Sequence, residues 1–356
     1  MADTHSPTTG VLEGFFGRSW SWEQRLRLAA FMHKEDFDFY LYAPKSDAHL
    51  RNRWRQDWPA DQWQALKNLR HTYHSAGIAF GLGLSPLDLC TPEGKADTKA
   101  FKEKITRINQ LEPDWLGLFF DDMRGDIPDL AARQAELSHF ATTHSSAQRI
   151  ILCPTYYSTD PVLDKVFGAR PSNYLPQLGR ELDPAIQVFW SGPQVCSATY
   201  PLEHLQEITH LLQRKPFLWD NYPVNDGAVK SQHLYLSPPE ASRFENQQHI
   251  EGIAANPMNQ FALSLPALAG LAQGIKCRAP ATIDTLLKKL FSQPLAELLR
   301  QDAPFFANHG LNELDENERQ RLLQRYRPHL EKEEAAREVT DWLNGGYTFD
   351  PACLTE

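Results

Sequence analysis

Short runs of consecutive apolar residues alternate with longer segments of helical spacing through most of this chain. In most of the segments between these runs, apolar residues recur every three or four positions, as on one face of a helix. Because the runs are continuous rather than alternating apolar and polar, they indicate parallel strands buried on both faces. The expected strands are 10–17, 37–45, 78–86, 115–123, 149–157, 186–195, 216–223 and 250–257. The expected helices are 21–36, 60–77, 98–111, 129–144, 174–182, 201–214 and 259–273.

Eight such units predict an α/β fold, a (β/α)8 TIM barrel, which typically takes about 250 residues. A doubly wound open sheet is the alternative, but the residues after the first run, EGFFGR, lack the glycine spacing of a dinucleotide loop. The apolar positions of 282–345 recur at helical spacing. We therefore expect an N-terminal tail at 1–9, a barrel at 10–278 and a helical extension at 279–356 packed on the barrel.

Composition and net charge argue against several classes of binding partner. Hydrophobic residues make up 42% of the 356 and charged residues 23%, as in ordinary globular proteins. The net charge of -9 argues against binding to nucleic acid or an anionic membrane, since both require a positive field. No apolar run approaches the roughly 18 residues of a membrane span. The first ten residues lack the basic and apolar regions of a secretory signal, so we expect a cytoplasmic protein.

The five cysteines are far apart, odd in number and without the spacing of a zinc site. No pair of histidines stands at ligand spacing with carboxylates. The sequence therefore predicts reduced thiols, no metal and no cofactor.

Polar and aromatic residues collect where the predicted strands end, and in a barrel the chemistry occurs at the carboxyl ends of the strands. Trp190 and Trp219 are among them and are expected to frame a flat-faced ligand such as a sugar. The residues at these ends are Glu13, Gly14, Lys45, Asp47, Asp121, Asp122, Tyr156, Tyr157, Trp190, Trp219, Asp220, Asn221, Asp226 and Asn256.

The pair Asp121-Asp122 closes the apolar run LFFDDM. Two adjacent carboxylates push their pKa values apart, so one can stay protonated and act as an acid. Neighbouring strand residues point to opposite faces, and both can face one site only if the chain turns at Asp122. The pair alone is equally compatible with a helix-capping Asp or an ion pair to Arg124.

Other candidates are individually ambiguous. The segment WDNYPVND (219–226) suits hydroxyl binding but equally suits a turn rich in Asn and Asp. Lys45 is either a substrate anchor or a solvated surface residue, and Tyr157 either a hydroxyl donor or a core ring. Gly14 permits either a turn or the close approach of a ligand to the backbone.

Taken together, the motifs resemble glycoside hydrolase family 84, the β-N-acetylglucosaminidases that include protein O-GlcNAcases and some enzymes called hyaluronidases. The resemblance covers about 10–275. The motifs that carry it are GVLEGFFGRSWSWEQR (10–25), YLYAPKSD (40–47), LFFDDM (118–123), CPTYYS (153–158), FWSGPQVCS (189–197), LWDNYPVND (218–226) and ANPM (255–258).

The resemblance implies a retaining exo-β-N-acetylglucosaminidase that uses substrate-assisted catalysis through an oxazoline. By match, Asp121 orients the 2-acetamido group and Asp122 is the general acid and then the base. Tyr157 bonds the oxazoline oxygen region, and Trp219 and Val195 line the acetamide pocket. The sugar is held by Gly14, Lys45, Asn221, Asp226 and Asn256.

The resemblance also implies a substrate class, an N-acetylglucosamine-containing glycoconjugate, with O-GlcNAc-modified protein as one candidate. No C-terminal stalk or acetyltransferase-like domain is recognisable, so we expect a compact bacterial-type member with an unassigned aglycone. Two alternatives stay open: a catalytically weak carbohydrate-binding protein on the same barrel, and an endo-acting or transglycosylating hexosaminidase.

Overall fold

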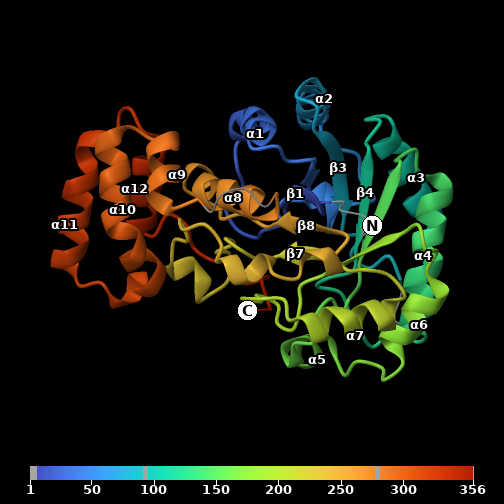
Figure 1. Ribbon diagram of the computed structural model, residues 1–356. Helices are drawn as coiled ribbons and strands as arrows, with labels where there is room; N and C mark the ends of the chain where they lie inside the picture. Colours follow the sequence, from blue (N-terminus) through green and yellow to red (C-terminus); the bar gives the residue numbers. More distant parts are fainter. Residues whose placement is uncertain (1–5, 91–94, 277–280, 356) are drawn as a thin grey trace.

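The computed structural model describes residues 6–90, 95–276 and 281–355 and shows eight parallel strands closed into a barrel (Figure 1). Each strand pairs with the next in sequence, and β1 also pairs with β8, with Thr8 opposite Gly252. The barrel prediction is confirmed and the open sheet is wrong. The strands are β1 (Thr8–Glu13), β2 (Phe39–Tyr42), β3 (Ala79–Leu84), β4 (Trp115–Phe119), β5 (Arg149–Cys153), β6 (Gln187–Trp190), β7 (Phe217–Asp220) and β8 (Gly252–Ala255).

The helices follow the predicted alternation. Ser21 begins the first helix with a capping box, in which its side chain accepts from Gln24 N and the Gln24 side chain accepts from Ser21 N. The barrel helices are α1 (Trp22–Lys34), α2 (Ala60–Ser75), α3 (Thr98–Asn109), α4 (Leu130–His144), α5 (Pro161–Phe167), α6 (Tyr174–Glu181), α7 (Leu202–Leu212) and α8 (Phe261–Ile275). The pattern missed α5, which at seven residues is too short to display a helical period.

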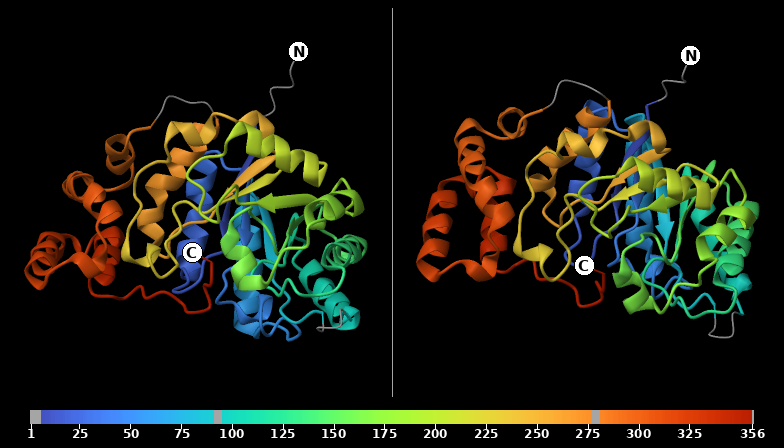
Figure 2. Two further views of the ribbon diagram at one scale, coloured as in Figure 1. Left: turned by 90° about the horizontal axis from the view of Figure 1, so that it is seen from below. Right: turned by 60° about the horizontal axis from the view of Figure 1, so that its bottom comes forward.

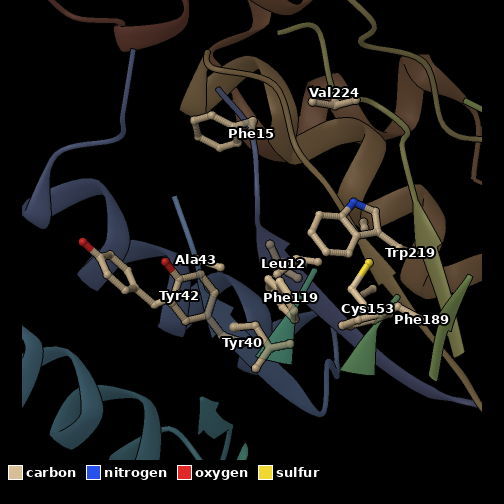
Figure 3. Packing of buried hydrophobic residues seen from close by; sticks show 14 of the residues in the cluster. Leu12, Phe15, Tyr40, Tyr42, Ala43, Phe119, Cys153, Phe189, Trp219 and Val224 are labelled. Carbon is tan, nitrogen blue, oxygen red and sulfur yellow. The ribbon is translucent and has the colours of Figure 1, made fainter. Parts of the chain in front are cut away.

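Aromatic rings fill the inside of the barrel up to its carboxyl end. The rings of Phe119 and Phe189 each lie 5.3 Å from the ring of Trp219. Figure 3 shows this indole above the two phenyl rings and beside the Cys153 sulfur. A Cβ on Gly83 would lie 2.2 Å from the Phe119 ring, so a glycine there makes room for the packing. The packed interior thus ends at the Trp219 indole, at the carboxyl ends of the strands.

Helices from the C-terminal part of the chain lie beside the barrel, next to α8 (Figure 1). Glu338 connects the two parts, because its buried carboxyl accepts hydrogen bonds from Ala262 N and Leu263 N, both at 3.0 Å, in the first turn of α8. These helices are α9 (Ile283–Leu290), α10 (Gln293–Asn308), α11 (Glu316–Tyr326) and α12 (Glu334–Leu343).

The division into tail, barrel and extension stays a prediction. Strand β1 begins at Thr8, inside the expected tail 1–9, and the expected boundary at 278 lies outside the described residues. Among the described residues, no helix has both the length and the apolar character needed to cross a bilayer.

Candidate active site

A cavity opens at the carboxyl ends of the strands and brings together all ten residues to which the resemblance gives a role. Those residues are Gly14, Lys45, Asp121, Asp122, Tyr157, Val195, Trp219, Asn221, Asp226 and Asn256. The other lining residues are Phe16, Cys153, Cys196, Val224, Cys353 and Thr355. Four other residues expected at the strand ends do not line the cavity and bond elsewhere: Glu13 with Arg25, Asp47 with Tyr42, Tyr156 with Gly168 O, and Asp220 with Arg243. Strand ends that are far apart in the sequence therefore meet in one place, although their chemical roles remain predictions.

The backbone turns at Asp122. Both carboxylates can face one site only because of this turn. Strand β4 ends at Phe119, and Asp122 has a left-handed φ of 59°. Lys45 Nζ bonds Asp121 Oδ2 and lies 3.1 Å from Asp122 Oδ2, so the two carboxylates share one cation. Arg124 pairs with Asp126 at 2.6 Å. The ion pair to Arg124 is thus not what holds this aspartate pair.

Burial and two cations separate the pKa values of the pair. Burial raises the pKa of Asp121, against the attraction of Lys45. Burial also opposes ionisation of Asp122, but Lys45 and Arg51 outweigh it and lower its pKa. Arg51 Nη1 lies 3.2 Å from Asp122 Oδ2. Both cations therefore favour the ionised form of Asp122.

The side chain of Lys45 is buried in the site, so the interpretation as a solvated surface lysine is wrong. Its side chain is 4% exposed, and its ammonium lies 5.6 Å from the Phe16 ring and 5.8 Å from the Trp219 ring. Burial disfavours the charged form, but Asp121 and Asp122 raise the pKa of Lys45. The ammonium stays charged as a fixed donor in the cavity.

A chain of hydrogen bonds joins four strand ends on the other side of the cavity. Gly14 N donates to Asn256 Oδ1 at 3.2 Å, and Asn256 Nδ2 donates to Asn221 Oδ1 at 3.1 Å. The Trp219 indole N–H also donates to Asn221 Oδ1, at 3.0 Å. Asn221 Nδ2 donates to Val195 O at 2.8 Å. Asn221 thus positions its neighbours through three hydrogen bonds, more than a simple turn requires, and its Nδ2 keeps a second hydrogen to donate.

Asp226 is fixed by the loop after β1. Phe16 N donates to its Oδ2 at 2.7 Å, and burial raises the pKa of Asp226 to about 6. Gly14 lies close to the indole: a Cβ there would be 2.6 Å from Trp219 Cζ2. This glycine therefore makes room for the indole, and the approach of a ligand to its backbone stays a prediction.

Tyr157 is both a buried ring and a hydroxyl on the cavity. Burial raises the pKa of Tyr157 well above its usual range, so the phenol stays protonated. Its Oη lies 3.0 Å from Thr355 Oγ1.

Trp190 corrects one expectation. It is fully buried and donates from its indole to His204 Nε2 at 2.9 Å, outside the barrel and away from the cavity lining. Because successive strand residues alternate between faces, a residue at a strand end can point either way. Only Trp219 of the two tryptophans lines the cavity.

Sequence reasoning missed Arg51, which contacts the catalytic candidate Asp122. Its one signal was position, since it follows Lys45 by six residues in the same loop. Thr355 and Cys353 had no signal of any kind, because they are distant in sequence from every strand. Among the described residues, no cluster of three or more His, Cys, Asp or Glu is arranged to hold a metal ion.

A family model described as β-N-acetylglucosaminidase matches residues 9–307. The chain belongs to this family. The match extends past the barrel and through most of α10, so the family's shared region includes the first helices of the C-terminal part. The β-N-acetylglucosaminidase family is one of glycoside hydrolases, as the motifs of family 84 led us to expect.

Relatives of known name agree with this membership. The protein O-GlcNAcases of Rattus norvegicus and Mus musculus are each 30% identical over 279 residues. That alignment covers 75% of this chain but 30% of each mammalian protein, so the chain spans less than a third of their length. An O-GlcNAc hydrolase from Thermobaculum terrenum superposes with a TM-score of 0.73 at 28% identity, covering 95% of this chain and 74% of the other.

Proposed function

We propose that this protein is a retaining exo-β-N-acetylglucosaminidase that uses the 2-acetamido group of its substrate as the nucleophile. The acetamido oxygen attacks the anomeric carbon while the bond to the leaving oxygen breaks and Asp122 donates a proton to that oxygen. The product is an oxazoline protonated on nitrogen, with that N–H still donated to Asp121. Asp122, now a carboxylate, then takes a proton from water as the water attacks the anomeric carbon. The bond from that carbon to the acetamido oxygen breaks, which restores the amide and gives net retention.

One observation carries the role of Asp121. Its Oδ1 is buried on the cavity and accepts no hydrogen bond from any described residue. A buried carboxylate oxygen without a donor is costly. An amide N–H from the substrate would satisfy it, and the same contact would orient the acetamido oxygen and stabilise the positive charge that develops on the nitrogen.

The proton must be on Asp122 when the reaction begins, although Lys45 and Arg51 favour the ionised form of that carboxyl. The two carboxylates titrate as a coupled pair that can share a single proton. An N–H donated to Asp121 would favour its ionised form, and a sugar hydroxyl that binds Lys45 would weaken the hold of that cation on Asp122. Substrate binding would thus move the proton to the acid.

The rest of the cavity suits a hexosamine. Trp219 supplies an apolar wall, and the carboxylate of Asp226 and the amides of Asn221 and Asn256 supply paired acceptors and donors for hydroxyls. The glycoconjugate that carries the sugar, O-GlcNAc-modified protein among the candidates, is the substrate class we propose.

The test compares Asp122→Asn with a matched control, Asp126→Asn, which removes an exposed carboxylate paired with Arg124 in the same loop. On an alkyl β-N-acetylglucosaminide, Asp122→Asn should lose about 10²–10⁴-fold in kcat, as expected when acid–base catalysis is removed. The control should match the unaltered protein. Sugar binding by calorimetry without turnover in the unaltered protein would instead support the carbohydrate-binding alternative.

A further inference from the structure

The chain returns to the cavity after its last helix. Beyond Leu343 the segment runs from the C-terminal helices back to the barrel, as the red trace in Figure 2 shows. Tyr347 anchors the start of this segment, because the Arg18 guanidinium lies 4.8 Å from the centre of the tyrosine ring. We call residues 348–355 the C-terminal strap.

The far end of the strap is in the candidate active site. Cys353 and Thr355 line the cavity together with the aspartate pair. Thr355 Oγ1 lies 3.0 Å from Tyr157 Oη, at hydrogen-bond distance. The family resemblance implies that Tyr157 bonds the oxazoline oxygen region, so Thr355 occupies a hydroxyl that the substrate would need.

The strap takes part of the space in which the proposed substrate would lie. Cys353 and Thr355 line the same cavity as Asp121, Asp122 and Tyr157. A sugar that makes a hydrogen bond to Tyr157 must therefore displace Thr355 from it.

The strap is the weakly held part of the lining. No residue from 348 to 355 is buried, and the large apolar side chains of Phe349 and Leu354 are 42% and 55% exposed. The other lining residues lie at the ends of barrel strands or in the loops that follow them, and most of them are buried. A segment with few buried contacts opens at low cost in free energy.

We propose that residues 348–355 form an autoinhibitory strap, in which Thr355 competes with the substrate for Tyr157 and must be displaced for the sugar to bind. The proposal rests on the proposed function, because it assumes that a hexosamine enters this cavity. When a site is open for only a fraction of the time, its apparent Kd equals the Kd of the open site divided by that fraction. Removing the strap should therefore strengthen binding without altering the chemical step.

The first experiment compares the full chain with a variant that ends at Tyr347, using a 4-nitrophenyl β-N-acetylglucosaminide. We expect KM to fall and kcat to stay the same. Removing one hydrogen bond with Thr355→Val should lower KM by about 2- to 10-fold, the range of one net hydrogen bond. Thr348→Val, the same change at an exposed position of the strap, is the matched control and should leave KM unchanged.

A synthetic peptide of residues 348–355 gives an independent measurement. Added to the shortened protein, it should inhibit competitively with the sugar, and the peptide with valine in place of Thr355 should inhibit less. An unchanged KM in the shortened protein, or a loss of kcat showing that the strap completes the site, would overturn the proposal. Absence of turnover and of sugar binding in every variant would instead reject the proposed function, and the strap proposal with it.

Discussion

Arg51 offers a direct test of how the charge on the aspartate pair is controlled. Its guanidinium lies 3.2 Å from Asp122 Oδ2 and favours the ionised form of that carboxyl. Replacing it in Arg51→Met removes the positive charge and keeps an unbranched apolar side chain. Since the general acid must be protonated, a higher pKa of the pair extends activity to higher pH.

The size of the shift follows from the distance and from what remains. Two unit charges about 4 Å apart attract by about 4 kcal/mol at an effective dielectric constant of 20. At 1.36 kcal/mol for each pKa unit, this is about 3 units. Lys45 stays 3.1 Å from Asp122 Oδ2, and water can enter the vacated space. We therefore expect about 1 unit, the low end of the 1–3 units usual for a nearby opposite charge.

The assay is the pH dependence of kcat/KM, which reports the ionisations of the protein without substrate. An alkyl β-N-acetylglucosaminide should be used, because a poor leaving group depends on the acid. The alkaline limb should move to higher pH by about 1 unit in Arg51→Met. Arg55→Met is the matched control, since Arg55 pairs with Asp97 at 3.0 Å, away from the cavity.

An alkaline limb that stays in place in Arg51→Met would refute this account of the pair. A limb that moves to lower pH would refute the sign of the electrostatic effect. An equal shift in Arg55→Met would show that overall charge, rather than contact with Asp122, sets the profile.

Two further predictions concern packing. In Gly14→Ala the new methyl would meet the Trp219 ring at 2.6 Å, so we expect kcat/KM to fall by about 10–100-fold through displacement of the indole; an unchanged value would show that the ring moves freely. In Glu338→Ala two backbone N–H groups of α8 lose their acceptor, which should lower the free energy of unfolding by about 1–3 kcal/mol. Urea titration measures this loss, and Glu338→Gln, which keeps an acceptor oxygen, should lose less. Equal stability of Glu338→Ala and the unaltered protein would mean that water replaces the carboxyl.

The barrel could be predicted because its signal is local and repeated. Each buried parallel strand must be apolar along its whole length, and each helix must present an apolar stripe, so eight units are visible in one sequence. The short helix α5 carried too few residues for a period to be seen. The first strand begins two residues earlier than expected because Thr8 and Thr9 pair with β8 although they are polar.

The site was predictable only where strand ends and motifs coincided. Side-chain direction at a strand end depends on register, and Trp190 faces His204 for that reason. Arg51 stands in a loop, where no period indicates which side chains turn inward. Thr355 contacts Tyr157 across 198 positions of the chain, a contact that follows from tertiary packing alone.

The left-handed backbone at Asp122 restricts which amino acids this position can accept. Most residues pay about 1–3 kcal/mol to adopt that conformation, whereas glycine, asparagine and aspartate adopt it readily. Of these three, aspartate alone carries a proton that it can donate and take back. Backbone geometry and proton transfer thus select the same residue, and asparagine is the replacement that removes the acid while leaving the turn intact.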